Sequence, residues 1–191
     1  MRPLLALLLC LLAAPALAHT GAGVPGGLVS GFTHPLFGWD HVVAMVAVGL
    51  WGAFLGAPAI WLLPVVFPMV MSVGAALGTA GMPLPSVETG IALSGIVLGI
   101  LVAFAVRAPI WVAAVIVGAF AIFHGHAHGT ELPSAANPLA YALGFVVATG
   151  LLHLCGIGFG LLTRVPAGAW AVRGAGVVIA LVGAAFLTGV A

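Results

Sequence analysis

The sequence is poor in charge. Only 4% of its 191 residues are charged, as four arginines and three acidic residues, and lysine is absent. A soluble domain carries about 25% charged residues, so this chain has too little charge to cover a surface that faces water. A formal net charge of +1 without a basic cluster excludes the electrostatic attraction on which nucleic-acid binding depends. With 64% hydrophobic residues, the composition predicts an integral membrane protein.

Two further absences exclude particular kinds of chemistry. Without lysine the chain has no Gly-rich, lysine-containing loop that binds phosphates, which excludes direct use of ATP. The sequence has two cysteines, Cys10 near the N-terminus and Cys155 in a long apolar stretch. If the N-terminal segment is removed, as argued next, a single thiol is left and an internal disulfide is excluded.

The N-terminal residues have the pattern of a secretory signal peptide. Arg2 precedes eleven apolar residues, 4–14, and an Ala-Leu-Ala sequence ends at Ala18. A positive start, a short apolar run and a small-x-small sequence are the three parts of such a leader. We therefore predict cleavage after Ala18, which divides the chain into a signal peptide, 1–18, and one transmembrane domain, 19–191.

Apolar runs separated by glycine and proline predict six membrane-spanning helices of roughly 20 residues each. The runs cover residues 38–55, 59–80, 87–106, 110–128, 138–162 and 167–190. The expected fold class is thus all-α: a polytopic membrane protein with six transmembrane helices after a cleaved signal peptide. With the mature N-terminus in the periplasm, Arg107, Arg164 and Arg173 fall at or near the cytoplasmic side, as the positive-inside rule requires.

The few ionisable residues gather in two segments, which is informative because such groups are costly at membrane depth and are usually kept for function. Residues 34–41 open the first span with two histidines and an aspartate. Residues 123–131 close the fourth span with three histidines and a glutamate. By the predicted topology both segments lie at the outer face of the membrane.

Helical spacing predicts which side chains of the first segment share a face. With Pro35 at the start of a helix, positions 34, 38 and 41 fall near one stripe, and Gly38 leaves open space between the two imidazoles. We therefore expect His34 and His41 to face the same partner.

The same reasoning divides the histidines of the second segment. His124 and His128 are one turn apart on a common face of the fourth span, whereas His126 points to the far side. We expect His124 and His128 to meet the first segment.

Imidazole nitrogens and carboxylate oxygens are the ligands that divalent nickel, cobalt, zinc or copper accept, and the distance of cysteine and methionine argues against Cu(I). Ionised Asp40 and Glu131 would offset the charge of a dication and lower the cost of bringing it below the surface. The alternative is that these side chains hold helix ends together without a metal.

Two other histidines are candidates for the same chemistry. His19 would place an imidazole beside the mature α-amine, and the pair can chelate a divalent metal. His153 lies in the fifth span, where it is either a relay point on a permeation path or a hydrogen-bond partner of a backbone carbonyl.

The two segments resemble the motifs of the HupE/UreJ family of bacterial nickel permeases. The family is marked by a His, five residues and Asp-His, here 34–41, and by Phe-His-Gly-x-Ala-His-Gly-x-Glu, here 123–131. The leader, the size and the six spans agree, so the resemblance covers essentially the whole chain. It implies import of nickel, in some members cobalt, across the inner membrane, with a link to hydrogenase or urease. It also implies that six residues handle the metal: His34, Asp40, His41, His124, His128 and Glu131. His126 occupies the variable position of the second motif.

We therefore expect a secondary, ATP-independent permease of the inner membrane, not an enzyme, with Ni²⁺ or Co²⁺ as its cargo and no resident cofactor. The ion would be captured at the periplasmic side and passed between the first, fourth and fifth spans. The alternative is a membrane-embedded hydrolase that holds Zn²⁺ with the same cluster and uses Glu131 as general base. A metal sensor or assembly factor would need a long exposed loop or tail. The expected partners are the metal ion and the lipid bilayer, and the oligomeric state is left open.

Overall fold

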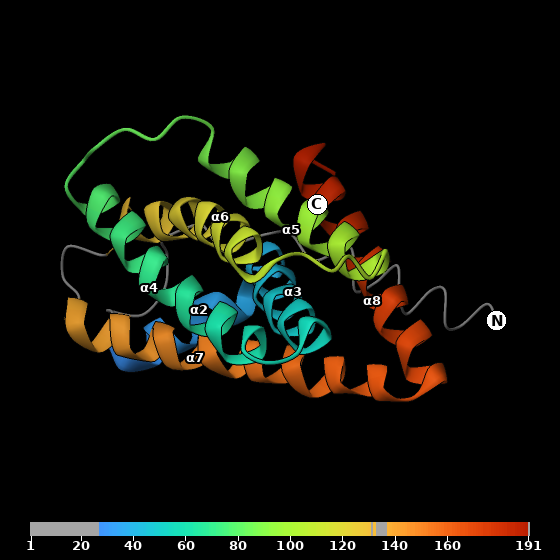
Figure 1. Cartoon of the computed structure of the whole chain (residues 1–191). Helices are drawn as coiled ribbons and strands as arrows, with labels where there is room; N and C mark the ends of the chain where they lie inside the picture. The colour runs from blue at the N-terminus through green and yellow to red at the C-terminus, as the bar shows by residue number, and fades with distance from the viewer. Residues whose placement is uncertain (1–26, 131, 133–136, 191) are drawn as a thin grey trace, which may run out of the picture.

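The computed structural model describes residues 27–130, 132 and 137–190, and all regular secondary structure in these residues is helical (Figure 1). The elements are α2 (Leu28–Phe37), α3 (Trp39–Leu55), α4 (Ala59–Thr79), α5 (Val87–Ala103), α6 (Ile110–Thr130), α7 (Pro138–Gly160), the 3₁₀ turn η2 (Leu161–Arg164) and α8 (Pro166–Leu187). The first residue of each of the six predicted spans lies within one residue of the first residue of an observed helix. The predicted signal peptide lies outside the described residues.

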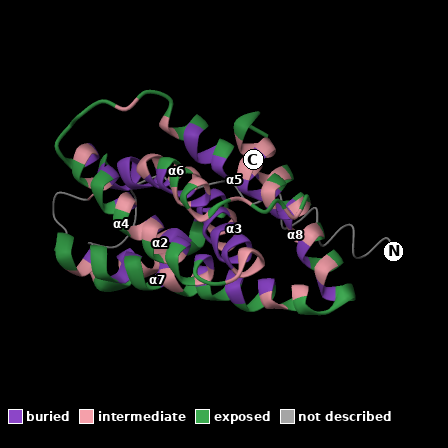
Figure 2. Cartoon of the chain, viewed as in Figure 1, coloured by how far each residue is buried: buried purple, intermediate pink, exposed green. Residues whose placement is uncertain are grey.

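The helices have the length and composition of a multi-pass membrane protein. Four of them, α4, α6, α7 with η2, and α8, can each cross a membrane, and the bent pair of α2 and α3 gives a fifth span if it is counted as one. The apolar helix α5 has 17 residues, about 26 Å, which is slightly short of the roughly 30 Å hydrocarbon layer. Figure 2 shows exposed residues along the outer helices. Many of them are large apolar side chains, including Trp61, Trp111 and Trp170 at 61%, 68% and 70% exposure. A surface of this kind suits lipid.

Helix α3 occupies the centre of the bundle. It packs against α4, α5, α7 and α8, and the outer helices also pair with one another, α4 with α6 and α5 with α8 (Figure 1). Its middle turns are fully buried, including Met45, Leu50 and Trp51. The Trp51 indole donates a hydrogen bond to the Val106 carbonyl at 3.0 Å, so α3 is tied to the connection between α5 and α6.

The prediction of one helical stripe through positions 34, 38 and 41 is wrong. Residues 28–37 form a separate helix, α2, which meets α3 at an angle of 86°. Gly38 has an extended backbone (φ −91°, ψ 102°) that ends the first helix, and Pro35 lies inside α2 and not at its start. His34 and His41 therefore stand on two helices.

Glycine allows the backbones of α4 and α6 to come into direct contact. A Cβ atom on Gly125 would collide with the Met71 carbonyl, and one on Gly129 would collide with the Ala75 carbonyl. Small residues at such positions are the usual means by which membrane helices approach closely. In this protein they press the histidine-bearing end of α6 against α4.

We predict that Gly125→Ala lowers the free energy of unfolding by about 1–3 kcal/mol or more, because the added methyl meets rigid backbone. The matched control is Gly158→Ala on α7, where a Cβ would meet nothing within 4 Å and where loss of a helical glycine adds about 0.5–1 kcal/mol. The midpoint of thermal unfolding in detergent measures both effects. Equal midpoints for the two variants would contradict the close contact.

Candidate metal site

Four imidazoles from three helices meet beside the N-terminus of α3. The ring centre of His41 lies 4.7 Å from that of His124 and 4.5 Å from that of His128. His34, on α2, lies 5.0 Å from His128. The two sequence motifs, more than eighty residues apart, are thus in direct contact. We call His34, His41, His124 and His128 the histidine cluster.

The cluster is shielded from solvent. His41 and His124 are 1% and 0% exposed, and His128 is 5% exposed, whereas His34 is half-buried. His124 and His128 reach the cluster together because they lie one turn apart on α6, as predicted. Such burial is costly for polar rings unless their nitrogens are engaged, so the hydrogen bonds of the cluster carry information about its chemistry.

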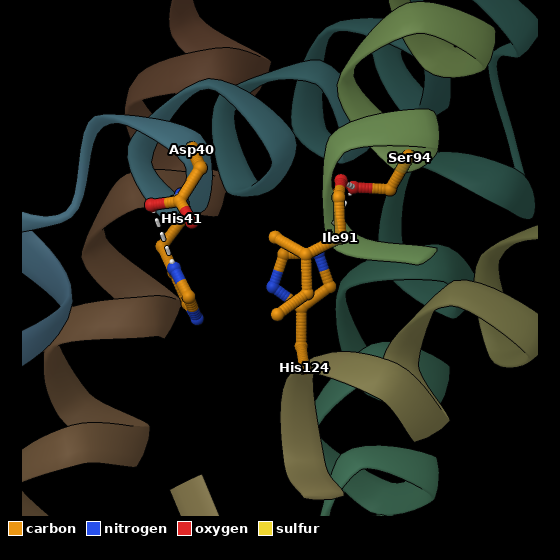
Figure 3. Close-up of polar contacts among 5 residues, drawn as sticks. All are labelled: Asp40, His41, Ile91, Ser94 and His124. Atoms are coloured by element: carbon orange, nitrogen blue, oxygen red, sulfur yellow. Dashed lines mark hydrogen bonds and ion pairs between the residues drawn. The ribbon is translucent and has the colours of Figure 1, made fainter. Parts of the chain in front are cut away.

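Asp40 fixes the protonation of His41. Its Oδ1 accepts hydrogen bonds from the His41 backbone N–H at 2.9 Å and from His41 Nδ1 at 3.0 Å (Figure 3). An ionised carboxylate only accepts, so Nδ1 carries the proton and Nε2 of the neutral ring keeps its lone pair. A carboxylate behind a histidine in this way orients the ring and strengthens it as a metal ligand. The structure therefore places Asp40 behind His41.

Ser94 of α5 plays the equivalent part for His124, and the sequence analysis missed it. The Ser94 hydroxyl donates to the Ile91 carbonyl at 2.6 Å and lies 2.9 Å from His124 Nε2 (Figure 3). Because its single hydrogen is used on Ile91, its oxygen accepts from Nε2–H. The lone pair of His124 is then on Nδ1. The only available sequence signal was a hydroxyl near the middle of an apolar span.

Aromatic side chains of α7 cover the cluster. The Phe145 ring lies 4.3 Å from His128 and 6.3 Å from His34, and Tyr141 lies 6.0 Å from His34. A cavity of about 240 Å³ between α4, α6 and α7 reaches His128, and its other walls are mostly apolar. The cluster thus packs against aromatic rings of α7 and borders a mostly apolar cavity.

The remaining predicted site residues lie elsewhere. His126 Nε2 is 2.7 Å from the Met82 carbonyl, so the ring ties α6 to the connection after α4 and points away from the cluster, as its spacing predicted. His153 is buried in α7, and the Phe67 ring contacts both His124 and His153. His19 and Glu131 lie outside the described residues.

The histidine cluster does not have the geometry of a preformed metal site. Among the described residues, no three His, Cys, Asp or Glu side chains stand in an arrangement ready to hold a metal ion. The rings of His41 and His124 meet edge to face, at 86°. A divalent ion bound there would have to turn these rings toward itself or keep some of its water. What the geometry supplies is a dense group of imidazole nitrogens, in which hydrogen bonds orient the rings of His41 and His124.

Comparison with known proteins identifies relatives over nearly the whole chain. The family model described as HupE / UreJ protein matches residues 7–186. The chain is 48% identical over 182 residues to protein HupE of Rhizobium leguminosarum bv. viciae, which covers 95% of each chain. No solved structure matches the chain. The family resemblance seen in the two motifs is confirmed.

We predict that Ser94→Ala weakens binding of Ni²⁺ about 10- to 100-fold, because loss of the acceptor behind His124 frees the ring to rotate and to change tautomer. Isothermal titration of the detergent-purified protein measures the affinity. The control is Thr188→Ala, which removes an exposed hydroxyl that is bonded only to its own helix. An unchanged affinity of Ser94→Ala for Ni²⁺ would contradict the role of Ser94 in orienting His124.

Proposed function

Because the chain belongs to the HupE/UreJ family, we propose that it is a secondary permease that carries Ni²⁺ or Co²⁺ into the cell across the bacterial inner membrane. The chain has the apolar, multi-helix architecture that such a function needs. In this proposal the ion is cargo and the protein needs no resident cofactor. A link to nickel enzymes, hydrogenase or urease, follows from the family.

The observation that carries the proposal is the contact of four imidazoles from α2, α3 and α6, three of them buried and one half-buried. Nitrogen donors favour Ni²⁺ and Co²⁺ over Mg²⁺ and Ca²⁺, which prefer oxygen. We propose that His34, His41, His124 and His128 bind the ion, and that Asp40 acts through His41.

Charge balance supports a role for the acidic residues. A dication that leaves water loses a large solvation energy, which nearby negative charge offsets. Asp40 is 5% exposed and bonded to His41, so its charge lies directly behind the proposed ligands. We propose that Glu131, the last residue of the second motif, adds the second negative charge.

We propose a topology of six spans in residues 19–191 after cleavage of a signal peptide at 1–18, with the mature N-terminus in the periplasm. The positions of two arginines support this direction. The Arg173 Nε donates to the Ala103 carbonyl at 2.8 Å, and Arg107 lies over the Phe54 ring at 5.3 Å. Both contacts lie at the C-terminal ends of α5 and α3, far from the histidine cluster at the start of α3. The positive-inside rule then assigns the cluster to the periplasmic side.

The hydrolase interpretation gains no support from the family or from the relative. In a permease the same histidine cluster replaces part of the hydration shell of the ion and passes the ion between α3, α6 and α7. Because the chain has no lysine for a phosphate-binding loop, we propose that transport does not use ATP directly.

The test is uptake of radiolabelled Ni²⁺ into proteoliposomes that contain the purified full chain, with wild type beside His41→Ala and Asp40→Asn. We expect His41→Ala to abolish uptake, because it removes a proposed ligand from the centre of the cluster. Asp40→Asn should lower the rate about 10- to 100-fold, because it leaves the ring in place without the carboxylate. Equal uptake by all three proteins would contradict the assignment of the metal site. Absence of uptake by wild type would contradict the proposed permease function.

The control is His126→Gln, which changes a histidine of the same motif. A glutamine amide can still donate to the Met82 carbonyl that His126 contacts. We expect near-normal uptake, measured in the same assay. A loss as large as that of His41→Ala would show that His126 handles the metal. Competition by excess Co²⁺ in the wild-type assay decides whether both ions share the site.

A further inference from the structure

Two polar side chains of α7 are buried without hydrogen-bond partners. Thr149 is 0% exposed and His153 is 1% exposed. Within the described residues, neither the Thr149 hydroxyl nor either ring nitrogen of His153 makes a hydrogen bond. They lie one turn apart, so both face the same neighbours. Burial of such groups without partners is unfavourable, which indicates that something else occupies their donors and acceptors during the working cycle.

A third polar group, from α4, lies beside His153. The Pro64 carbonyl makes an electrostatic contact with the His153 ring that falls short of hydrogen-bond geometry. In a regular helix that carbonyl would accept from the N–H of residue 68, but residue 68 is proline and has none. The carbonyl therefore lacks this partner within its own helix, and it is the backbone group of α4 that contacts His153. Imidazole, hydroxyl and carbonyl together form a set of nitrogen and oxygen donors.

This set lies close to the histidine cluster but deeper in the bundle. The ring centre of Phe67 is 5.5 Å from that of His124 and 5.6 Å from that of His153, so a single aromatic ring contacts both histidines. Phe145 contacts His128 of the cluster, and His153 follows it on α7 by eight residues, or about 12 Å along the helix axis. The same helix thus contacts both places.

We propose that His153, Thr149 and the Pro64 carbonyl form a second site for a divalent cation, which receives the ion from the histidine cluster on its way inward. This inference rests on the proposed function. An ion that leaves the cluster enters an apolar bundle, where its charge is very unfavourable without ligands. A sequence of sites, each of limited affinity, lets an ion enter and still leave.

The test uses Ni²⁺ alone as probe and two measurements on the purified full chain: the initial rate of uptake into proteoliposomes and the equilibrium affinity in detergent. The variants are His153→Leu and Thr149→Val. We expect each to lower the uptake rate about 10-fold or more, while the affinity of the histidine cluster stays within about twofold of wild type. Thr149→Ser, which restores the hydroxyl, should recover most of the rate.

Matched controls separate this site from a structural role. Cys155→Ala changes an exposed residue of the same helix and should leave uptake unchanged. The apolar variants should be at least as stable to heat as wild type, because they remove polar groups that lack partners.

The outcomes are distinct. No uptake by wild type would overturn the permease and this inference together. Normal uptake by wild type and by both apolar variants would overturn only the second site. Weaker binding or lower thermal stability in the variants would also overturn it, because the residues would then act through the cluster or through the fold.

Discussion

The backbones of α4 and α6 touch through glycine, and the position of every histidine on α6 follows from that contact. Gly125 and Gly129 approach Met71 and Ala75 so closely that no side chain fits between. The histidines at 124 and 128 alternate with these glycines on the same two turns, so they occupy the adjoining face and point toward α2 and α3. The two glycines and the two histidines each repeat every four residues. A single orientation of α6 therefore sets both its packing against α4 and the placement of its proposed ligands.

Two hydrogen bonds then orient two of the imidazole rings that this packing brings together. Asp40 holds the proton of His41 on Nδ1, and Ser94 holds that of His124 on Nε2. The two rings, 4.7 Å apart, therefore present different nitrogens as acceptors. Each orienting group comes from outside the ring contact, Asp40 from the first turn of α3 and Ser94 from α5. Two polar side chains beyond the imidazoles thus orient two of the four rings of the cluster, those of His41 and His124.

The sequence predicted the helices better than it predicted the site. Glycine and proline mark the helix starts, so the starts of α3 to α8 were located to within one residue, although α2 was not predicted as a separate helix. The four-residue spacing correctly separated His126 from His124 and His128. The predicted common helical face of His34 and His41 was wrong because of Gly38. A glycine beside an apolar run does not reveal whether one helix continues or a second helix begins at an angle of 86°. Ser94 was missed for another reason: a single serine in a spanning helix usually bonds its own backbone. Its second contact depends on α5 packing near α6, which one sequence does not show.

The distribution of charge bears on what drives the proposed movement. The carboxylate of Asp40 lies at the histidine cluster, whereas the proposed inner site has one imidazole and two uncharged oxygens. An ion that moves inward therefore leaves negative charge behind, and local electrostatics favour its return. A membrane potential that is negative inside favours inward movement of a cation by about 2.3 kcal/mol per charge for each 100 mV. For a dication that crosses the whole membrane, a potential of about 100 mV therefore contributes about 4.6 kcal/mol against its return to the cluster. A chain without a site for ATP can thus hold its cargo tightly at the outer surface and still deliver it, provided that the potential acts on the step from the cluster to the inner site.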